Sequence, residues 1–143
     1  MIKQADEYDI EIIEEILLDE VNWMTKVGLQ NQWNESNIKW PILSKSYNIN
    51  NFYIAYQNGL PCACMALTDY DPTYWPSVPK GESLFLHKVA VKRTLAGKGL
   101  LKELIDYAKH LAIGYSIKDI RLNCNQHRNK LRGLYECGRE DFL

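Results

Sequence analysis

Apolar and polar residues follow each other along the chain with periods that switch between those of a helix and a strand. From Asp9 onward, apolar residues recur at the spacing of one helical face, and acidic residues take most of the positions between them. The apolar residues of this stripe are Ile13, Ile16, Leu17, Val21 and Met24. The pattern predicts an amphipathic helix with Asp9 as its N-cap and its end near Gly28.

The clearest local signal is that of a β-hairpin. Two strand-like segments, 52–57 and 61–68, flank Asn58 and Gly59, a pair that suits a type I′ turn. The next segment, 69–81, contains three prolines, two aspartates and several aromatic residues. It cannot extend a strand ladder, so we expect a loop that is long enough to cover a pocket.

The remaining elements follow from the same periods. In chain order they are a short strand at 2–5, a second helix at 35–44 that Pro41 kinks or delays, a strand at 84–91, a helix at 99–113, a strand at 119–124 and a helix at 129–137. The resulting order, β-α-α-β-β-β-α-β-α, predicts one mixed α/β domain over residues 1–143. Its later strand-helix-strand unit is expected to be a right-handed crossover.

The charge and hydropathy of the chain argue against some classes of binding partner. The chain has 17 Lys and Arg residues against 18 Asp and Glu residues, so no net field draws it to nucleic acid or to an anionic membrane. Its apolar runs are shorter than the roughly 20 residues that a membrane-spanning helix needs. Acidic residues stand where a signal peptide would have a basic start. We therefore expect a cytoplasmic protein that binds neither nucleic acid nor membranes.

Cysteine and histidine spacing argues against a metal site. The four cysteines are spread along the chain, and the three histidines are isolated from them in sequence. A zinc site would require closely paired ligands. Cys62 and Cys64 lie in a strand-like segment and are expected to be buried free thiols.

Two glycines precede the helix predicted at 99–113. Gly97 and Gly99 let the backbone approach a ligand, and the unpaired amides at a helix start favour phosphate oxygens. A Walker loop is excluded because Lys98 is followed by glycine instead of a hydroxyl residue, and Lys102 stands where a dinucleotide motif requires its third glycine. On the residues alone, a diphosphate site and a simple tight turn both remain open.

Three segments of the chain resemble the acyl-CoA-binding core of the GNAT N-acetyltransferase superfamily. They are Leu86–Arg93, Ala96–Leu100 and, later, Leu131–Glu136. The resemblance covers nearly the whole chain and implies a GNAT-like mixed sheet with acetyl-CoA as cosubstrate. It implies that the strand before the loop bonds the pantetheine arm through its backbone and that the loop amides hold the pyrophosphate. The cofactor-binding residues so implied are Val89, Ala90, Val91, Ala96, Gly97, Lys98, Gly99, Leu100 and Asn129.

The chain departs from the family pattern at several places, among them the displaced Gly138 and Phe142 after Tyr135. Thr94 stands where family members usually carry Gln or Arg, and Asn129 comes one residue later than the family's Asn. The chain also ends eight residues after Tyr135, so C-terminal strands are expected to be short or absent. Either truncation or a partner that covers the strand edge, as in a homodimer, would account for this length.

The resemblance also suggests how acetyl transfer would proceed. Tyr135 would protonate the sulfur of the departing CoA thiolate, and the backbone N–H of Val89 would polarise the thioester carbonyl. His87 and Glu82 are candidates for the general base, as is a chain of water molecules. The alternatives are a packed aromatic at Tyr135, an ordinary strand histidine at His87 and a solvated acid at Glu82.

The candidate acceptor site combines aromatic residues with an acid. Trp33, Tyr70, Asp71 and Trp75 would hold a cationic amine of a small molecule or a peptide, although packing is the alternative role of the aromatics. We therefore expect an N-acetyltransferase that acts on a primary amine. A non-catalytic acyl-CoA-binding sensor or subunit is the main rival, and an interaction domain without a ligand is a third.

Overall fold

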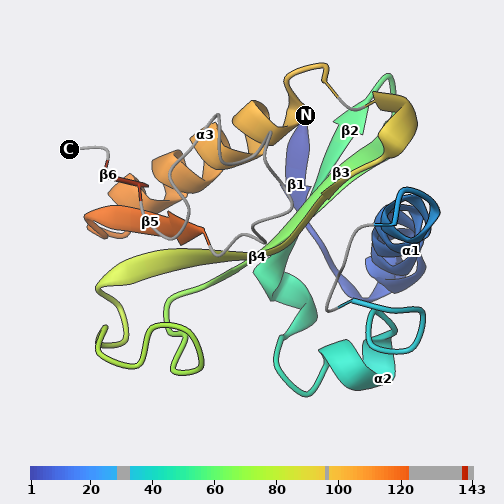
Figure 1. Cartoon of the computed structure of the whole chain (residues 1–143). Helices are drawn as coiled ribbons and strands as arrows, with labels where there is room; N and C mark the ends of the chain where they lie inside the picture. The colour runs from blue at the N-terminus through green and yellow to red at the C-terminus, as the bar shows by residue number, and fades with distance from the viewer. Residues whose placement is uncertain (29–32, 96, 123–139, 142–143) are drawn as a thin grey trace. The chain divides into compact units, whose positions relative to one another are not determined.

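The computed structural model describes residues 1–28, 33–95, 97–122 and 140–141, which form helices and strands in the predicted mixed α/β order (Figure 1). The strands follow the order β1-β2-β3-β4-β5-β6. Their bounds are β1 Ile2–Gln4, β2 Phe52–Gln57, β3 Leu60–Thr68, β4 Ser83–Val91, β5 Asp119–Leu122 and β6 Glu140–Asp141. The helices are α1 Ile10–Lys26, α2 Trp40–Leu43 and α3 Leu100–Gly114, with short 3-10 turns at Glu7–Asp9, Ile49–Asn51 and Arg93–Leu95. The helix predicted at 129–137 lies outside the described residues.

The chain divides into two compact units. Unit 1 consists of Met1–Ala66 and Lys88–Leu104, and unit 2 consists of Leu67–His87 and Ile105–Leu143. In the part of the chain that the structure describes, no helix has both the length and the apolar character needed to cross a membrane.

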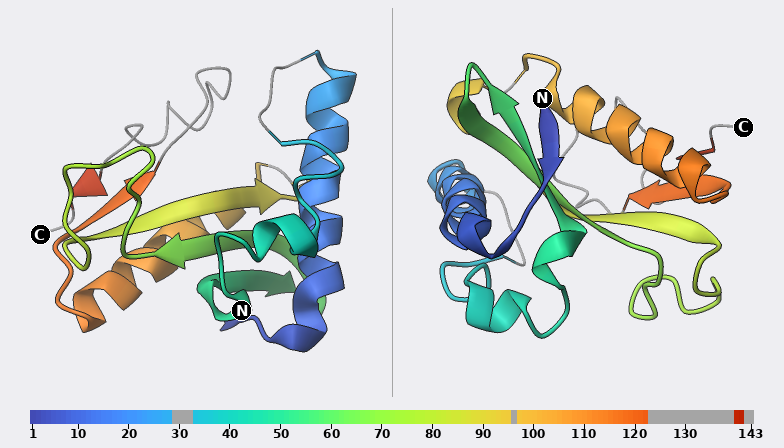
Figure 2. Two further views of the ribbon diagram at one scale, coloured as in Figure 1. Left: turned by 90° about the horizontal axis from the view of Figure 1, so that it is seen from below. Right: turned by 180° about the vertical axis from the view of Figure 1, so that it is seen from behind.

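The core of unit 1 lies between α1 and a sheet of antiparallel strands. β2 pairs with β1 on one side and with β3 on the other. Figures 1 and 2 show α1 alongside these strands. All five apolar residues of the predicted α1 stripe are buried, and four of them pack in a cluster that includes Phe52, Ile54 and Cys64; the four are Ile13, Ile16, Leu17 and Val21. Helical periodicity therefore located the buried face of α1 correctly, because that face is the one with enough apolar area to bury.

The hairpin between β2 and β3 has the predicted turn. Asn58 and Gly59 have φ angles of 53° and 77°, and Gln57 pairs with Leu60 across the turn. Positive φ at both central residues defines the type I′ turn, whose twist matches that of the flanking strands. The Asn-Gly pair thus sets the register of the strands on either side.

Local capping differs in detail from the prediction at the two N-terminal helices. Asp9 precedes α1, but its carboxylate accepts a hydrogen bond from the Asp6 amide instead of capping α1. The second helix is shorter than expected and begins late, with Pro41 in its first turn. The Glu14 carboxylate of α1 accepts a hydrogen bond from the Trp40 amide at 2.7 Å and so holds the start of α2.

Unit 2 contains the parallel pair that the strand-helix-strand pattern predicted. β4 pairs with β5 in parallel, with Ser83 opposite Asp119 and Phe85 opposite Arg121. β6 then pairs with β5 antiparallel. The sequence pattern did not identify a strand at 140–141, since two residues are too few to show alternation.

The turn between β2 and β3 gives a direct test of the conformational argument. Gly59→Ala should lower the free energy of unfolding by roughly 1–2 kcal/mol, because an L-residue is disfavoured at this positive φ. Gly114→Ala is the matched control, since an added Cβ meets no atom within 4 Å at either glycine and Gly114 ends a helix. The control should leave stability unchanged or raise it. Urea unfolding of both variants measures the effect, and equal stability of the two variants would refute the turn assignment.

Candidate functional site

Strand β4 contains a residue with a left-handed backbone conformation, which no sequence pattern predicted. Lys88 has a φ of 51°, which is uncommon for a residue other than glycine. Its carbonyl oxygen lies 3.6 Å from the Cys64 Sγ donor, and its Nζ lies 4.9 Å from the centroid of the Trp33 ring. Burial does not alternate along β4, since the residues from Ser83 to Leu86 are all buried, as are Val89 and Ala90 after Lys88. The chain also passes from unit 2 to unit 1 at this residue.

The glycine loop of unit 1 has the geometry that its residues predicted. Gly97 and Gly99 both have a φ of 82°, and α3 begins directly afterwards at Leu100. Gly97, Lys98 and Gly99 are exposed, whereas Leu100 is buried. The first amides of an α-helix have no partner within the helix, and they carry the positive end of its dipole. The exposed turn therefore offers a place where an anionic group can approach α3.

Helix α1 holds the chain that leads into this loop. The Arg93 amide donates a hydrogen bond to the Asp19 carboxylate at 2.9 Å, and the Arg93 guanidinium lies 3.7 Å from the centroid of the Trp23 ring. The Lys92 Nζ lies 3.4 Å from the Glu15 carboxylate. The acidic side of α1 therefore positions the segment that leads into the loop. No sequence signal links these residues, because more than 70 positions separate Arg93 from Asp19.

In unit 2, one face of β4 carries a row of functional groups. Side chains alternate along a strand, so Ser83, Phe85 and His87 share a face. Trp75 of the loop 69–82 covers this row, with its ring centroid 6.4 Å from that of Phe85. The Arg121 guanidinium lies 4.7 Å from the centroid of the Trp75 ring. The prediction of a loop at 69–81 is confirmed, and it packs on the strand that precedes the left-handed residue.

At the start of this row, the side chains of a buried polar network hydrogen-bond to one another. The Ser83 hydroxyl donates to one oxygen of Asp119 and accepts a hydrogen bond from the Arg121 Nε at 3.0 Å. The second oxygen of Asp119 lies 3.6 Å from an Arg121 terminal nitrogen. These contacts compensate for the burial of two charged groups, so we assign this network to holding β4 and β5 together.

At the other end of the row, His87 meets a hydroxyl and a carboxylate. Its Nε2 lies 3.0 Å from the Thr68 Oγ1 and 4.0 Å from the Asp71 Oδ2. The Oδ1 atom of Asp71 accepts a hydrogen bond from the Tyr74 amide, whereas Oδ2 is buried and has no hydrogen-bond partner among the described residues. The His87 ring stacks on Phe85 with centroids 6.5 Å apart. This arrangement can hold a proton-accepting imidazole beside a negative charge.

The other predicted site residues do not all belong to the same unit, and some lie outside the described residues. Tyr70 is exposed and lies beside Asp71 in the loop of unit 2, while Glu82 is exposed at the end of that loop. Trp33 belongs to unit 1, where it packs against the core cluster and under Lys88. Ala96, Asn129 and Tyr135 lie outside the described residues.

Thr68 was missed by the sequence analysis. It ends β3, nineteen positions before His87, and no local pattern pairs it with a histidine.

Two other chemistries find little support in the described residues. Cys62 and Cys64 are buried free thiols, as predicted. Burial raises the pKa of both thiols, so neither is a thiolate nucleophile at neutral pH. Within the described ranges, no group of three His, Cys, Asp or Glu side chains could hold a metal ion.

Comparison with known proteins identifies a matching family and solved structures with a similar fold. A family model described as the acetyltransferase (GNAT) family matches residues 13–138. Among solved structures, a GNAT-family acetyltransferase from Listeria monocytogenes is 21% identical with a TM-score of 0.72, and the match covers 94% of this chain and 82% of that chain. A predicted acetyltransferase from Clostridium acetobutylicum, solved with acetyl-CoA, is 18% identical with a TM-score of 0.63, and the match covers 100% of this chain and 92% of that chain.

A larger protein matches over part of its length. N-acetylglutamate synthase from Neisseria gonorrhoeae, complexed with coenzyme A and N-acetyl-glutamate, is 16% identical with a TM-score of 0.64. That match covers 94% of this chain but 27% of the synthase chain. No curated protein sequence matches this chain. At these identities the solved structures show the fold, and they confirm the predicted fold class.

The polar network at Ser83 provides a stability test for unit 2. Ser83→Ala should lower the free energy of unfolding by about 1–3 kcal/mol, because it removes both a donor to buried Asp119 and an acceptor for Arg121. Ser77→Ala, in an exposed part of the loop, should change stability by less than about 0.5 kcal/mol. Chemical denaturation measures both variants. A Ser83 variant as stable as the Ser77 variant would show that the network contributes nothing to the fold.

Proposed function

The chain belongs to the acetyltransferase (GNAT) family, and on this basis we propose that it transfers the acetyl group of acetyl-CoA to a primary amine by direct attack. The observation that carries the proposal is the exposed turn at Gly97 and Gly99, where both glycines have a φ of 82° and α3 follows at once. Such a turn presents consecutive amides and a positive helix end to phosphate oxygens.

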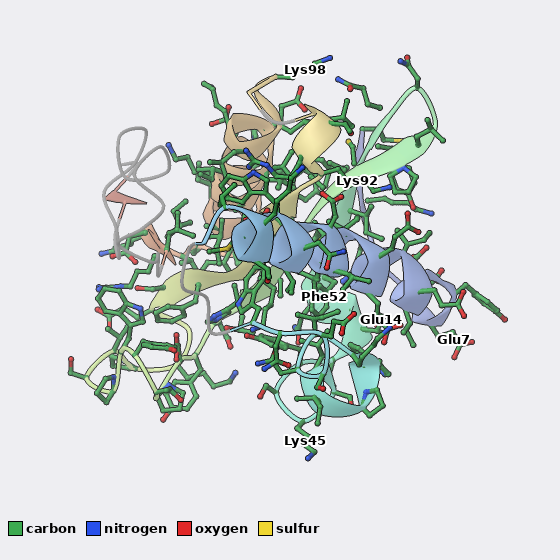
Figure 3. All side chains as sticks on the ribbon, turned by 45° about the vertical axis from the view of Figure 1, so that its right-hand side comes forward. Glu7, Glu14, Lys45, Phe52, Lys92 and Lys98 are labelled. Atoms are coloured by element: carbon green, nitrogen blue, oxygen red, sulfur yellow. The ribbon has the colours of Figure 1, made fainter. Side chains whose placement is uncertain are left out.

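The cosubstrate is acetyl-CoA, with its pyrophosphate on the turn before α3. The similar structures from Neisseria gonorrhoeae and Clostridium acetobutylicum were solved with coenzyme A and acetyl-CoA respectively, which supports this assignment. The amides from Gly97 to Leu100 supply the donors, and the exposed Lys98 adds a positive charge (Figure 3). The end of β4, from Val89 to Val91, lies along the pantetheine arm. Ala96 and Asn129 complete the proposed set, and both lie outside the described residues.

The reaction forms one bond and breaks another. The lone pair of the acceptor nitrogen attacks the thioester carbonyl carbon, the C–N bond forms, and the C–S bond breaks. The amine loses a proton to a general base, and the departing sulfur gains a proton from Tyr135. His87 is the base that the geometry favours, since its ring is half-buried and the Asp71 carboxylate lies 4.0 Å from its Nε2. A nearby negative charge stabilises the imidazolium that forms when the ring takes up a proton. Glu82 is exposed, and we give it no role in the reaction.

The acceptor site belongs to the loop that carries Asp71. Tyr70 and Tyr74 are exposed on this loop, and Trp75 on the same loop is half-buried. Aromatic faces close to a carboxylate attract a primary ammonium group before it loses its proton. Both a small molecule and a peptide fit this description. Trp33 contributes to the core of unit 1 and is not included in the proposed acceptor site.

Two glycine substitutions can separate the role of the turn in binding acetyl-CoA from the effect of backbone strain on stability. Gly99→Ala should weaken acetyl-CoA binding by roughly tenfold, because an L-residue at a φ of 82° turns the loop amides away from their present direction. Gly28→Ala is the matched control: its φ is 74°, and an added Cβ likewise meets no atom within 4 Å, but it follows α1. Both variants should lose similar stability, and only Gly99→Ala should lose affinity in isothermal titration. Unchanged affinity in Gly99→Ala would contradict the pyrophosphate assignment.

Turnover with a panel of amines tests the reaction itself. The purified chain should release free CoA thiol from acetyl-CoA in the presence of at least one primary amine. Tyr135→Phe should lower kcat by roughly 100-fold, the usual scale of a lost general acid, and leave acetyl-CoA affinity unchanged. Tyr115→Phe, at an exposed site on the surface of the chain, is the control and should retain full activity. Tight binding of acetyl-CoA without thiol release from any amine would favour the non-catalytic sensor.

A further inference from the structure

The loop that carries Asp71 is attached to the strands of unit 2 on both sides of this residue. Before Asp71, the Thr68 hydroxyl at the end of β3 donates a hydrogen bond to the Tyr70 carbonyl oxygen at 3.3 Å. After it, the half-buried Trp75 ring lies on β4, with its centroid 6.4 Å from that of Phe85. The position of Asp71 therefore depends on where the Trp75 ring is held.

A short turn connects Asp71 to Trp75 rigidly. The Trp75 amide donates a hydrogen bond to the Asp71 carbonyl oxygen at 2.9 Å, and the Tyr74 amide donates to the Asp71 Oδ1 at 3.2 Å. One bond fixes the main chain of Asp71 and the other fixes its carboxylate. A displacement of the Trp75 ring from the sheet would therefore displace the carboxylate as well.

Arg121 of β5 supplies the contact that holds the Trp75 ring from the sheet. Arg121 pairs with Phe85 in the parallel register, so the two side chains share one face of the sheet. The Arg121 guanidinium lies 4.7 Å from the centroid of the Trp75 ring. The Arg121 side chain is only 14% exposed, and an aromatic ring attracts a cation more strongly where water is excluded.

The guanidinium is itself fixed by the polar network between β4 and β5. Its Nε donates to the Ser83 hydroxyl at 3.0 Å, and a terminal nitrogen lies 3.6 Å from the Asp119 carboxylate. The donors of a guanidinium lie in its plane, so the group can use them while its face stacks on an aromatic ring. A lysine ammonium is a point charge and cannot make this set of contacts.

We propose that Arg121 is a positioning residue of the acceptor site, which acts through Trp75 to hold the Asp71 carboxylate in place. The inference rests on the proposed function, in which the negative charge of Asp71 attracts the ammonium group of the acceptor. A charge that is already held in place does not have to be ordered when the amine binds, and this lowers the entropic cost of binding. Arg121 acts on the loop and not on the substrate.

Amide hydrogen exchange measures this anchor without any substrate. Arg121→Lys keeps the positive charge but loses the planar group. In the full chain, exchange of the Tyr74 and Trp75 amides should become roughly tenfold faster, because the turn opens more often. Lys3→Gln is the matched control, since it removes a cation–π contact with Tyr56 in unit 1 and should leave both amides unchanged. Equal exchange in Arg121→Lys and the wild-type chain would overturn the proposal.

Steady-state kinetics test the role in the acceptor site. The amine is whichever of putrescine, benzylamine and a lysine-containing peptide gives the fastest thiol release. Arg121→Lys should raise the KM for this amine roughly tenfold and leave the Kd of acetyl-CoA unchanged, because the proposed pyrophosphate site belongs to unit 1. A variant that was merely less stable would contain less folded enzyme, which lowers kcat at constant KM. Faster exchange with an unchanged amine KM would show that the anchor does not serve the acceptor site.

A second variant tests whether Arg121 acts through Trp75. Trp75→Leu removes the aromatic ring and leaves the partners of Arg121 in the sheet intact. It should also speed exchange of the Tyr74 amide, and exchange as slow as in the wild-type chain would overturn the proposal even if Arg121→Lys did not fold. The double variant should have the same amine KM as Trp75→Leu alone. If Arg121→Lys raises KM by the same factor in both backgrounds, Arg121 acts by another route and the proposal is wrong.

The two readouts separate this inference from the proposed function. If no amine releases thiol, the proposed function fails, while the exchange rates still decide whether Arg121 anchors the loop. If thiol is released and Arg121→Lys changes neither the exchange nor the amine KM, the positioning role fails and the transferase assignment stands. Thermal unfolding establishes that each variant is folded.

Discussion

The reversal of backbone handedness at Gly97 and Gly99 is the constraint on which the candidate site depends. Both residues have a φ of 82°, a conformation that residues with a side chain seldom adopt. The two reversals lie in the segment between the end of β4 at Val91 and the start of α3 at Leu100, and the turn that they form is exposed. Helix starts leave amides unpaired wherever they occur, and the absence of a Cβ at Gly97 and Gly99 lets an anionic ligand come close to these amides.

Helix α1 holds in place the segment that leads into this turn. Asp19 and Glu15 contact Arg93 and Lys92, and Trp23 supports the Arg93 guanidinium. Exposed ion pairs contribute little to stability by themselves. Their effect here is to restrict the segment before the loop, which lowers the conformational entropy that a ligand would otherwise have to remove on binding. One face of α1 therefore builds the core while another orders the loop.

The polar groups along β4 in unit 2 differ in how well they are satisfied. Ser83 meets Asp119 and Arg121 in a network that uses its donor and its acceptor. Asp71 keeps one buried oxygen without a hydrogen bond from the described residues, 4.0 Å from His87. Buried polar atoms in folded proteins are normally paired, and exceptions are concentrated where a charge or proton moves. The first network is therefore structural, and we propose that the second takes part in the chemistry.

By itself, the sequence determined the elements whose signals are local. The period of α1, the Asn58-Gly59 turn and the glycines before α3 each depend on a few neighbouring residues and were predicted correctly. Tertiary structure alone decided the left-handed Lys88, the contact of Thr68 with His87 and the assignment of Trp33 to unit 1. The physical reason is that these features depend on side chains brought together by packing from distant positions. No periodicity or turn preference within a short segment encodes such contacts.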